Sequence, residues 1–100
     1  MDFKFGERKL KALYYDGKDV HKYPCEVVDA FFEVMSAIAA AKDERDLYAL
    51  KGLHYEKLSG KWKDKRSARL NKQYRLLLQV EEEDSGGKYL LIEKLDDHTY

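Results

Sequence analysis

The spacing of apolar residues changes near Gly60, and this change limits the folds open to the chain. After Pro24, apolar side chains recur every three or four residues, at Val27, Val28, Phe31, Phe32, Met35, Ile38 and Ala39. This spacing predicts a helix with a wide apolar stripe and with Pro24 in its first turn. Beyond Gly60 the period is two, because Ala68 and Leu70 alternate with polar neighbours as in a strand. The sequence therefore predicts helices first and strands second.

The remaining predicted elements are short and lie on both sides of this helix. The stretch "DFKF" alternates as a strand does, residues 7–15 form an amphipathic helix that Gly17 ends, and "DERDLYAL" forms a third helix capped by Asp43. "YRLLLQV" is apolar enough for a central strand, and "KYLLIEKL" follows it after the turn "EDSGG". Two or three N-terminal helices packed on a small antiparallel sheet make an α+β fold. We expect residues 1–100 to form one domain.

Several classes of protein are disfavoured by what the sequence lacks. The stretch "MDFKFGERK" is charged from its second residue, and no apolar run approaches ~18 residues, so we expect neither a secretory signal nor a membrane span. The single cysteine, Cys25, suits a reducing compartment, and we expect a cytoplasmic protein. His21 is close to Cys25 in sequence, but no second pair of ligands follows at zinc-site spacing. We therefore expect no metal and no cofactor.

Charge is distributed unevenly along a chain whose formal net charge is zero. Residues 51–75 contain nine Lys or Arg and two acidic residues, a local charge of +7. Residues 81–100 contain two Lys and seven acidic residues, a local charge of −5. This segregation indicates one basic surface on a neutral protein, or else a solvated loop rich in lysine.

The three residues "NKQ" between Leu70 and Tyr74 have a length that is common in hairpin loops. If Leu70 and Tyr74 close the ladder, Arg69 and Arg75 stand opposite each other on one face of the sheet. Like charges in opposed positions are destabilising unless an anion lies between them. The hairpin therefore predicts a phosphate site.

The next hairpin directs the C-terminal residues "DDHTY" toward this arginine pair. A turn centred between Ser85 and Gly86 places Arg75 opposite about Asp96. His98 would then lie close to both arginines. A frayed tail is the alternative, since chain ends are commonly disordered.

Two guanidinium groups, an imidazole and nearby carboxylates suit RNA cleavage without a metal. A base removes the proton from the ribose 2′-OH, cations stabilise the crowded phosphorane, and an acid protonates the departing 5′-oxygen. Histidine suits either proton transfer near neutral pH, and arginine holds phosphate through paired donors. His54, in "GLHYEKLSG", is the second candidate imidazole, although a surface or hydrogen-bonded role is common for a single histidine.

The segment "LHYEKLSGKWKDKRSARLNKQYRLLLQV", followed after a turn by a strand and "DDH", resembles the HigB-like branch of the RelE/ParE toxin superfamily. These are toxins of bacterial type II toxin-antitoxin systems, and the similarity covers about residues 48–100 well and the helical half loosely. The family's histidine, its L-x-G, its S-x-R-x-N-x-Q-Y-R and its closing D-Y-H fall on His54, Leu58, Gly60, Ser67, Arg69, Asn71, Gln73, Tyr74, Arg75, Asp96 and His98. The closing tyrosine is Asp97 here, with Tyr100 as a candidate substitute.

The resemblance implies a RelE-like, ribonuclease-like sheet with helices on one face, and an endoribonuclease that cleaves mRNA in the ribosomal A site. It also implies a HigA-like helix-turn-helix antitoxin, through which alone this chain would reach operator DNA. The predicted catalytic residues are Arg69 and Arg75 on the scissile phosphate, Asp96 orienting an imidazole, and His54 and His98 as proton carriers. Which histidine is the base stays open.

The predicted RNA-binding surface consists of Lys57, Lys61, Lys63, Lys65, Arg66, Lys72, Tyr74 and Tyr100. Tyrosines stack on bases, although packing is an equal alternative for Tyr74, as it is for Tyr55 and Trp62. Two other functions are compatible with the residues. One is a ParE-type toxin that poisons DNA gyrase and cleaves nothing, and the other is a catalytically degenerate protein that retains the fold and the antitoxin. The histidines discriminate, because a pure binder has no need of them.

Overall fold

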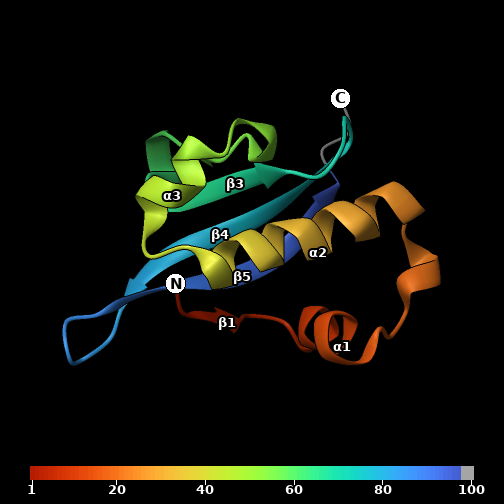
Figure 1. Ribbon diagram of the computed structural model, residues 1–100, viewed down its shortest axis with the longest axis horizontal. Helices are drawn as coiled ribbons and strands as arrows, with labels where there is room; N and C mark the ends of the chain where they lie inside the picture. The colour runs from red at the N-terminus through yellow and green to blue at the C-terminus, as the bar shows by residue number, and fades with distance from the viewer. Residues whose placement is uncertain (98–100) are drawn as a thin grey trace.

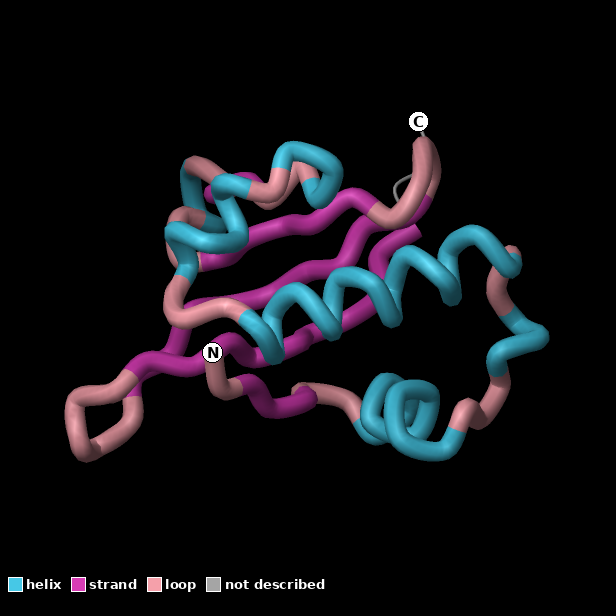
Figure 2. Tube along the Cα trace, viewed as in Figure 1, coloured by secondary structure: helices cyan, strands magenta, loops and turns pink. Residues whose placement is uncertain are grey.

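The computed structural model describes residues 1–97 of the chain, which form an α+β fold (Figure 1, Figure 2). The strands are β1 (Phe3–Phe5), β2 (Glu56–Lys57), β3 (Lys65–Arg69), β4 (Tyr74–Glu82) and β5 (Lys88–Asp97). The helices are α1 (Arg8–Asp16), α2 (Cys25–Ala40) and α3 (Glu44–Ala49), with 3₁₀ turns at 20–22, 51–53 and 60–62. Within residues 1–97, no helix is both long and apolar enough to cross a membrane.

The sheet is mixed, with the strand order β1-β5-β4-β3-β2 and the long strand β4 at its centre. The four later strands are antiparallel neighbours, as predicted. The first strand pairs with β5 in parallel, a feature that the predicted antiparallel sheet lacks. Pairing in this way brings Phe3 and Phe5 into edge and tilted contacts with Tyr14 of α1, at ring-centroid distances of 5.8 and 5.5 Å. These contacts give "DFKF" an aromatic cluster to pack against.

The helix boundaries follow the local signals in the sequence. Gly17 ends α1 in the left-handed conformation, with φ of 65°, where a side chain would be strained. Pro24 precedes the first residue of α2, which suits its missing N–H group. The carboxylate of Asp43 accepts a hydrogen bond from the backbone N–H of Arg45 and so caps α3. Hydrogen bonds from Arg45 also hold the pKa of the Asp43 carboxyl below its usual value.

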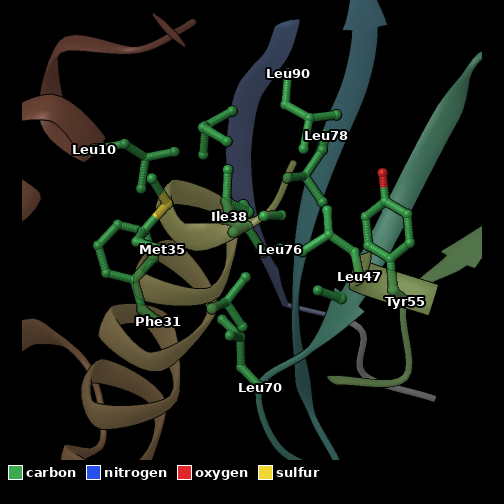
Figure 3. Packing of buried hydrophobic residues seen from close by; sticks show 14 of the residues in the cluster. Leu10, Phe31, Met35, Ile38, Leu47, Tyr55, Leu70, Leu76, Leu78 and Leu90 are labelled. Atoms are coloured by element: carbon green, nitrogen blue, oxygen red, sulfur yellow. The ribbon is translucent and has the colours of Figure 1, made fainter. Parts of the chain in front are cut away.

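The core lies between one face of the sheet and the helices, with α2 crossing in front of the strands (Figure 1). The residues buried from α2 are Val27, Phe31, Val34, Met35 and Ile38, so the stripe includes Val34, which was not predicted, and leaves Ala39 exposed. Leu76, Leu78 and Leu90 meet them from β4 and β5 (Figure 3), and Ile92 of β5 belongs to the same core. Leu77 does not belong to this core cluster but is only 2% exposed, so the other face of β4 is buried at this position, while Arg75 and Gln79 on that face are partly buried.

Candidate active site

The β3–β4 hairpin sets the geometry of the candidate site. The backbone N–H of Leu70 donates to the Tyr74 carbonyl at 3.0 Å and closes the ladder. The side-chain oxygen of Asn71 accepts from the N–H groups of Gln73 and Tyr74 at 2.8 and 2.6 Å, which is an Asx turn that stabilises the loop. Arg69 consequently lies opposite Arg75, and the predicted register is confirmed.

The two arginines differ in their partners. Arg75 lies opposite Asp96 of β5, and its Nε donates to Asp96 Oδ2 at 3.1 Å. Both side chains are largely covered, with exposed fractions of 22% and 24%, and Lys94 Nζ approaches Asp96 Oδ1 at 3.8 Å. Arg69 is exposed and makes no ion pair or side-chain hydrogen bond to any residue from 1 to 97. The protein's own carboxylate therefore neutralises one arginine of the pair, while the other is available to a ligand.

A β-bulge in β5 brings Asp96 to this position. Leu77 pairs with Lys94 and Leu78 pairs with Ile92, so Glu93 is the extra residue in the ladder. An unbroken register would have turned Lys94 and Asp96 toward the helices and Leu95 away from them. With the bulge, Leu95 packs against the core and Asp96 lies opposite Arg75.

A cavity of about 290 Å³ opens at this end of the sheet. Its lining comes from the end of the 51–53 turn, β2, β3, the hairpin loop and the start of β4, and consists of His54, Glu56, Ser67, Arg69, Asn71, Lys72, Gln73, Tyr74 and Arg75. Three of these residues are permanently cationic and one is a carboxylate, so the lining itself is net positive. A cavity with paired guanidinium groups, a lysine and an imidazole is suited to binding a phosphodiester and to moving protons around it.

Comparison with known proteins identifies the family of this chain. Residues 3–97 match the HigB-like toxin family, described as RelE-like toxin of type II toxin-antitoxin system HigB. The chain belongs to this family. It is also 35% identical over 79 residues to Toxin HigB-1 of Vibrio cholerae serotype O1, an alignment that covers 79% of this chain and 83% of that toxin.

Solved toxin structures share the fold at low sequence identity. The YoeB/ParE toxin from Agrobacterium tumefaciens aligns with a TM-score of 0.58 and 14% identity, covering 99% of this chain and 100% of that one. YafQ from Escherichia coli strain BL21(DE3) aligns with a TM-score of 0.59 and 15% identity, covering 96% and 91%. YafQ in the E. coli DinJ-YafQ toxin-antitoxin complex aligns with a TM-score of 0.52 and 16% identity, covering 97% and 91%. The predicted RelE-like architecture is thereby confirmed.

The predicted RNA-binding cations of this HigB-like chain fall into two groups. Lys57, Lys61 and Lys63 are exposed, and Lys72 lines the cavity. Lys65 instead donates to Glu93 at 2.7 Å, and Arg66 donates to Glu44 at 2.8 Å. The structure thus does not bring these last two charges to the cavity, because Lys65 is paired with Glu93 of β5 and Arg66 with Glu44 of α3.

The predicted aromatic and imidazole groups are also placed unevenly. Tyr74 lines the cavity, and its ring also packs edge-on against Tyr23 at a ring-centroid distance of 6.3 Å. His54 is exposed and lines the cavity from a left-handed backbone conformation, with φ of 47°. His98 and Tyr100 lie outside the described residues, so their roles stay predictions.

Four residues of the cavity were missed as site residues, namely Glu56, Ser67, Asn71 and Gln73. Ser67, Asn71 and Gln73 occur in the family pattern, so a signal for them was present. Glu56 lies in β2, which is two residues long and carries too little alternation to be seen in the sequence. It is the one carboxylate among the described residues that line the cavity.

Proposed function

We propose that this HigB-like toxin is a ribosome-dependent mRNA endonuclease that cleaves through the ribose 2′-OH, without a metal of its own. The observation that carries the proposal is the opposed Arg69–Arg75 pair in a net-positive cavity that also holds His54. Membership of the HigB-like family supports it, because the likeness to RelE-like toxins implies an endoribonuclease. In this proposal residues 1–100 form a single toxin domain. The reaction takes place in the cytoplasm.

The catalytic roles follow from chemistry at the cavity. Arg69 and Arg75 hold the scissile phosphate and stabilise the charge of the phosphorane. His54 and His98 exchange protons with the 2′-OH and the leaving oxygen, in either order. Asp96 accepts a hydrogen bond from the Arg75 guanidinium at 3.1 Å and would also orient an imidazole.

The RNA backbone would follow the exposed cations beside the cavity. Lys72 lies in the lining, and Lys57, Lys61 and Lys63 are exposed on the adjoining segment. Lys65 and Arg66 would add to the positive electrostatic potential but would not contact the RNA directly, because each already forms an ion pair with a carboxylate of the protein. Tyr74 and Tyr100 are the proposed stacking partners of bases.

We further propose a cognate antitoxin as the physiological partner. The solved DinJ-YafQ toxin-antitoxin complex, whose toxin shares this fold, supports that proposal. A HigA-like helix-turn-helix antitoxin would neutralise the toxin and contact operator DNA, which this chain would reach only through that antitoxin.

The test is induction of the chain alone in bacteria, with primer-extension mapping of mRNA ends. Wild type should arrest growth and create new 5′ ends within translated messages. Arg75→Ala should remove them, since loss of one donor to a transition-state oxyanion lowers the rate by roughly 100-fold to 1,000-fold. Lys88→Ala, which removes an exposed cation at the other end of β5, is the matched control. Growth arrest without cut messages would refute the nuclease and favour the gyrase-poisoning class.

A further inference from the structure

A buried polar network lies beside the cavity without contributing to its lining. Glu44 Oε1, on α3, accepts from the Tyr55 hydroxyl at 2.6 Å and from Arg66 Nε at 2.8 Å. The Glu44 and Arg66 side chains are 25% and 12% exposed, and Tyr55 is 7% exposed. Hydrogen bonds to a charged group in such a protected place are stronger than average and restrict their partners closely.

Tyr55 is the link between this network and the cavity. Its ring belongs to the hydrophobic core with Leu47 (Figure 3), and Tyr48 packs against it edge-on at 4.9 Å. The residues on either side of it, His54 and Glu56, both line the cavity. An anchored residue between two lining residues determines where both of them stand.

The backbone alone holds this stretch weakly. The strand β2 has two residues, Glu56 and Lys57, paired with Ser67 and Arg66 at the edge of the sheet. His54 is in a left-handed conformation that ordinary side chains adopt only when their surroundings impose it. Arg66 joins the two restraints, because its backbone pairs with Lys57 and its guanidinium binds Glu44.

We propose that Glu44 is a positioning residue that sets the β2 wall of the cavity, carrying His54 and Glu56, against the arginine wall on β3 and β4. Its effect is exerted through Tyr55 and Arg66. The kinetic consequence rests on the proposed nuclease function, whereas the placement of the wall does not. Two titration effects agree with the geometry. Burial, followed by the hydrogen bond to Glu44, raises the pKa of the Tyr55 phenol. Burial lowers the pKa of Arg66, but Glu44 together with the neighbouring Tyr48 and Tyr55 raises it by more, so the pKa of Arg66 is raised overall.

The proposal separates two kinds of kinetic effect. Arg69 and Arg75 lie on the paired strands β3 and β4, and within residues 1–97 neither of them bonds to Glu44. Loss of the network should therefore spare phosphate binding and hence KM, while a displaced His54 should lower kcat. A displacement of ~1 Å in a catalytic group lowers rates by up to about 100-fold.

The experiment compares Glu44→Ala, Glu44→Gln and Tyr55→Phe with Arg45→Gln, a control that breaks an exposed ion pair on the same helix. Glu44→Ala leaves the Arg66 guanidinium without its carboxylate and can fail to fold, so Tyr55→Phe, which removes one hydroxyl, is the decisive variant. Its kcat for mRNA cleavage on ribosomes should fall roughly tenfold, within the range for a misplaced group, with KM unchanged. Glu44→Gln retains an acceptor oxygen and should lie nearer to wild type than Glu44→Ala.

NMR supplies the readout that does not require catalysis. In Tyr55→Phe, amide shifts of His54 and Glu56 should move while the affinity for inorganic phosphate stays as in wild type. If wild type itself cleaves no mRNA, the proposed function fails and these shifts alone judge the positioning role. A folded Tyr55→Phe with unmoved His54 and Glu56 amides would overturn the inference, as would an equal loss in the Arg45→Gln control.

Discussion

Replacing Asp96 by Asn should tighten the binding of inorganic phosphate to the cavity. The Asp96 carboxylate accepts a hydrogen bond from Arg75 Nε at 3.1 Å. An anion that binds the Arg75 guanidinium is therefore repelled by the neighbouring Asp96 carboxylate. Asn has the same shape and keeps an oxygen that can accept from the same Nε atom. The change therefore removes the charge while leaving the hydrogen bond and the fold in place.

The expected size follows from Coulomb's law. An anion on the other side of the same guanidinium lies on the order of 6 Å from the carboxylate, where the repulsion is about 0.7 kcal/mol in bulk water and about 3 kcal/mol at an effective dielectric constant near 20. The Asp96 side chain is 24% exposed, which favours a value between these limits. About 1.4 kcal/mol corresponds to a tenfold lower Kd.

The assay is a phosphate titration followed through the Arg75 side-chain Nε–H resonance at constant ionic strength. Constant ionic strength is essential because salt screens charges over about 10 Å at 0.1 M. Glu82→Gln removes the same charge at the far end of β4 and serves as the control. An Asp96→Asn protein with unchanged or weaker phosphate affinity would refute competition between Asp96 and the phosphate for Arg75.

Three further outcomes are expected. The pKa of Tyr55 is raised in the folded protein, so unfolding becomes more favourable as the pH rises above about 10, where the phenol ionises in the unfolded chain. Tyr55→Phe should therefore reduce the fall in melting temperature between neutral and alkaline pH. An unaltered dependence of the melting temperature on pH would contradict this. Asn71→Ala should lower the free energy of unfolding by about 1–2 kcal/mol, since two backbone donors lose their acceptor, as measured by urea titration. His98→Ala should abolish mRNA cutting with little effect on stability, whereas deletion of residues 96–100 should also lower stability because it removes the end of β5 and the partner of Arg75; unaltered cutting by His98→Ala in primer extension would move the proton-transfer role to His54.

The hairpin that carries the arginines could be predicted because its signal is local. A three-residue loop bounded by Leu70 and Tyr74 allows few registers, and the register fixes which side chains face each other. The register predicted from the turn after β4 is wrong by one residue beside the turn, where Glu82 pairs with Lys88. The bulge at Glu93 makes up that residue, so the predicted pairing of Arg75 with Asp96 is nevertheless observed.

The partners of Lys65 and Arg66 could not be predicted in this way. Lys65 meets Glu93, 28 residues later, and Arg66 meets Glu44, 22 residues earlier. Such pairs depend on how helix α3 and strand β5 pack, so a count of charges along the sequence overstates the basic surface. The parallel pairing of β1 is similar, because it requires the chain to return across the whole helical half.

The bulge at Glu93 bears on how relatives of this chain can gain or lose residues. Alternation in β5 runs in opposite phase on its two sides: Leu90 and Ile92 face the core before it, and Leu95 does so after it. Loss of one residue at Glu93 or Lys94 would restore a regular ladder with Leu95 still inside and Asp96 still beside Arg75. Loss of Leu95 would instead turn Lys94 toward the core. A residue can thus be lost from this strand only at the bulge, at Glu93 or Lys94. A relative whose sequence has a gap there would place Leu95 in the core and Asp96 beside Arg75 without a bulge.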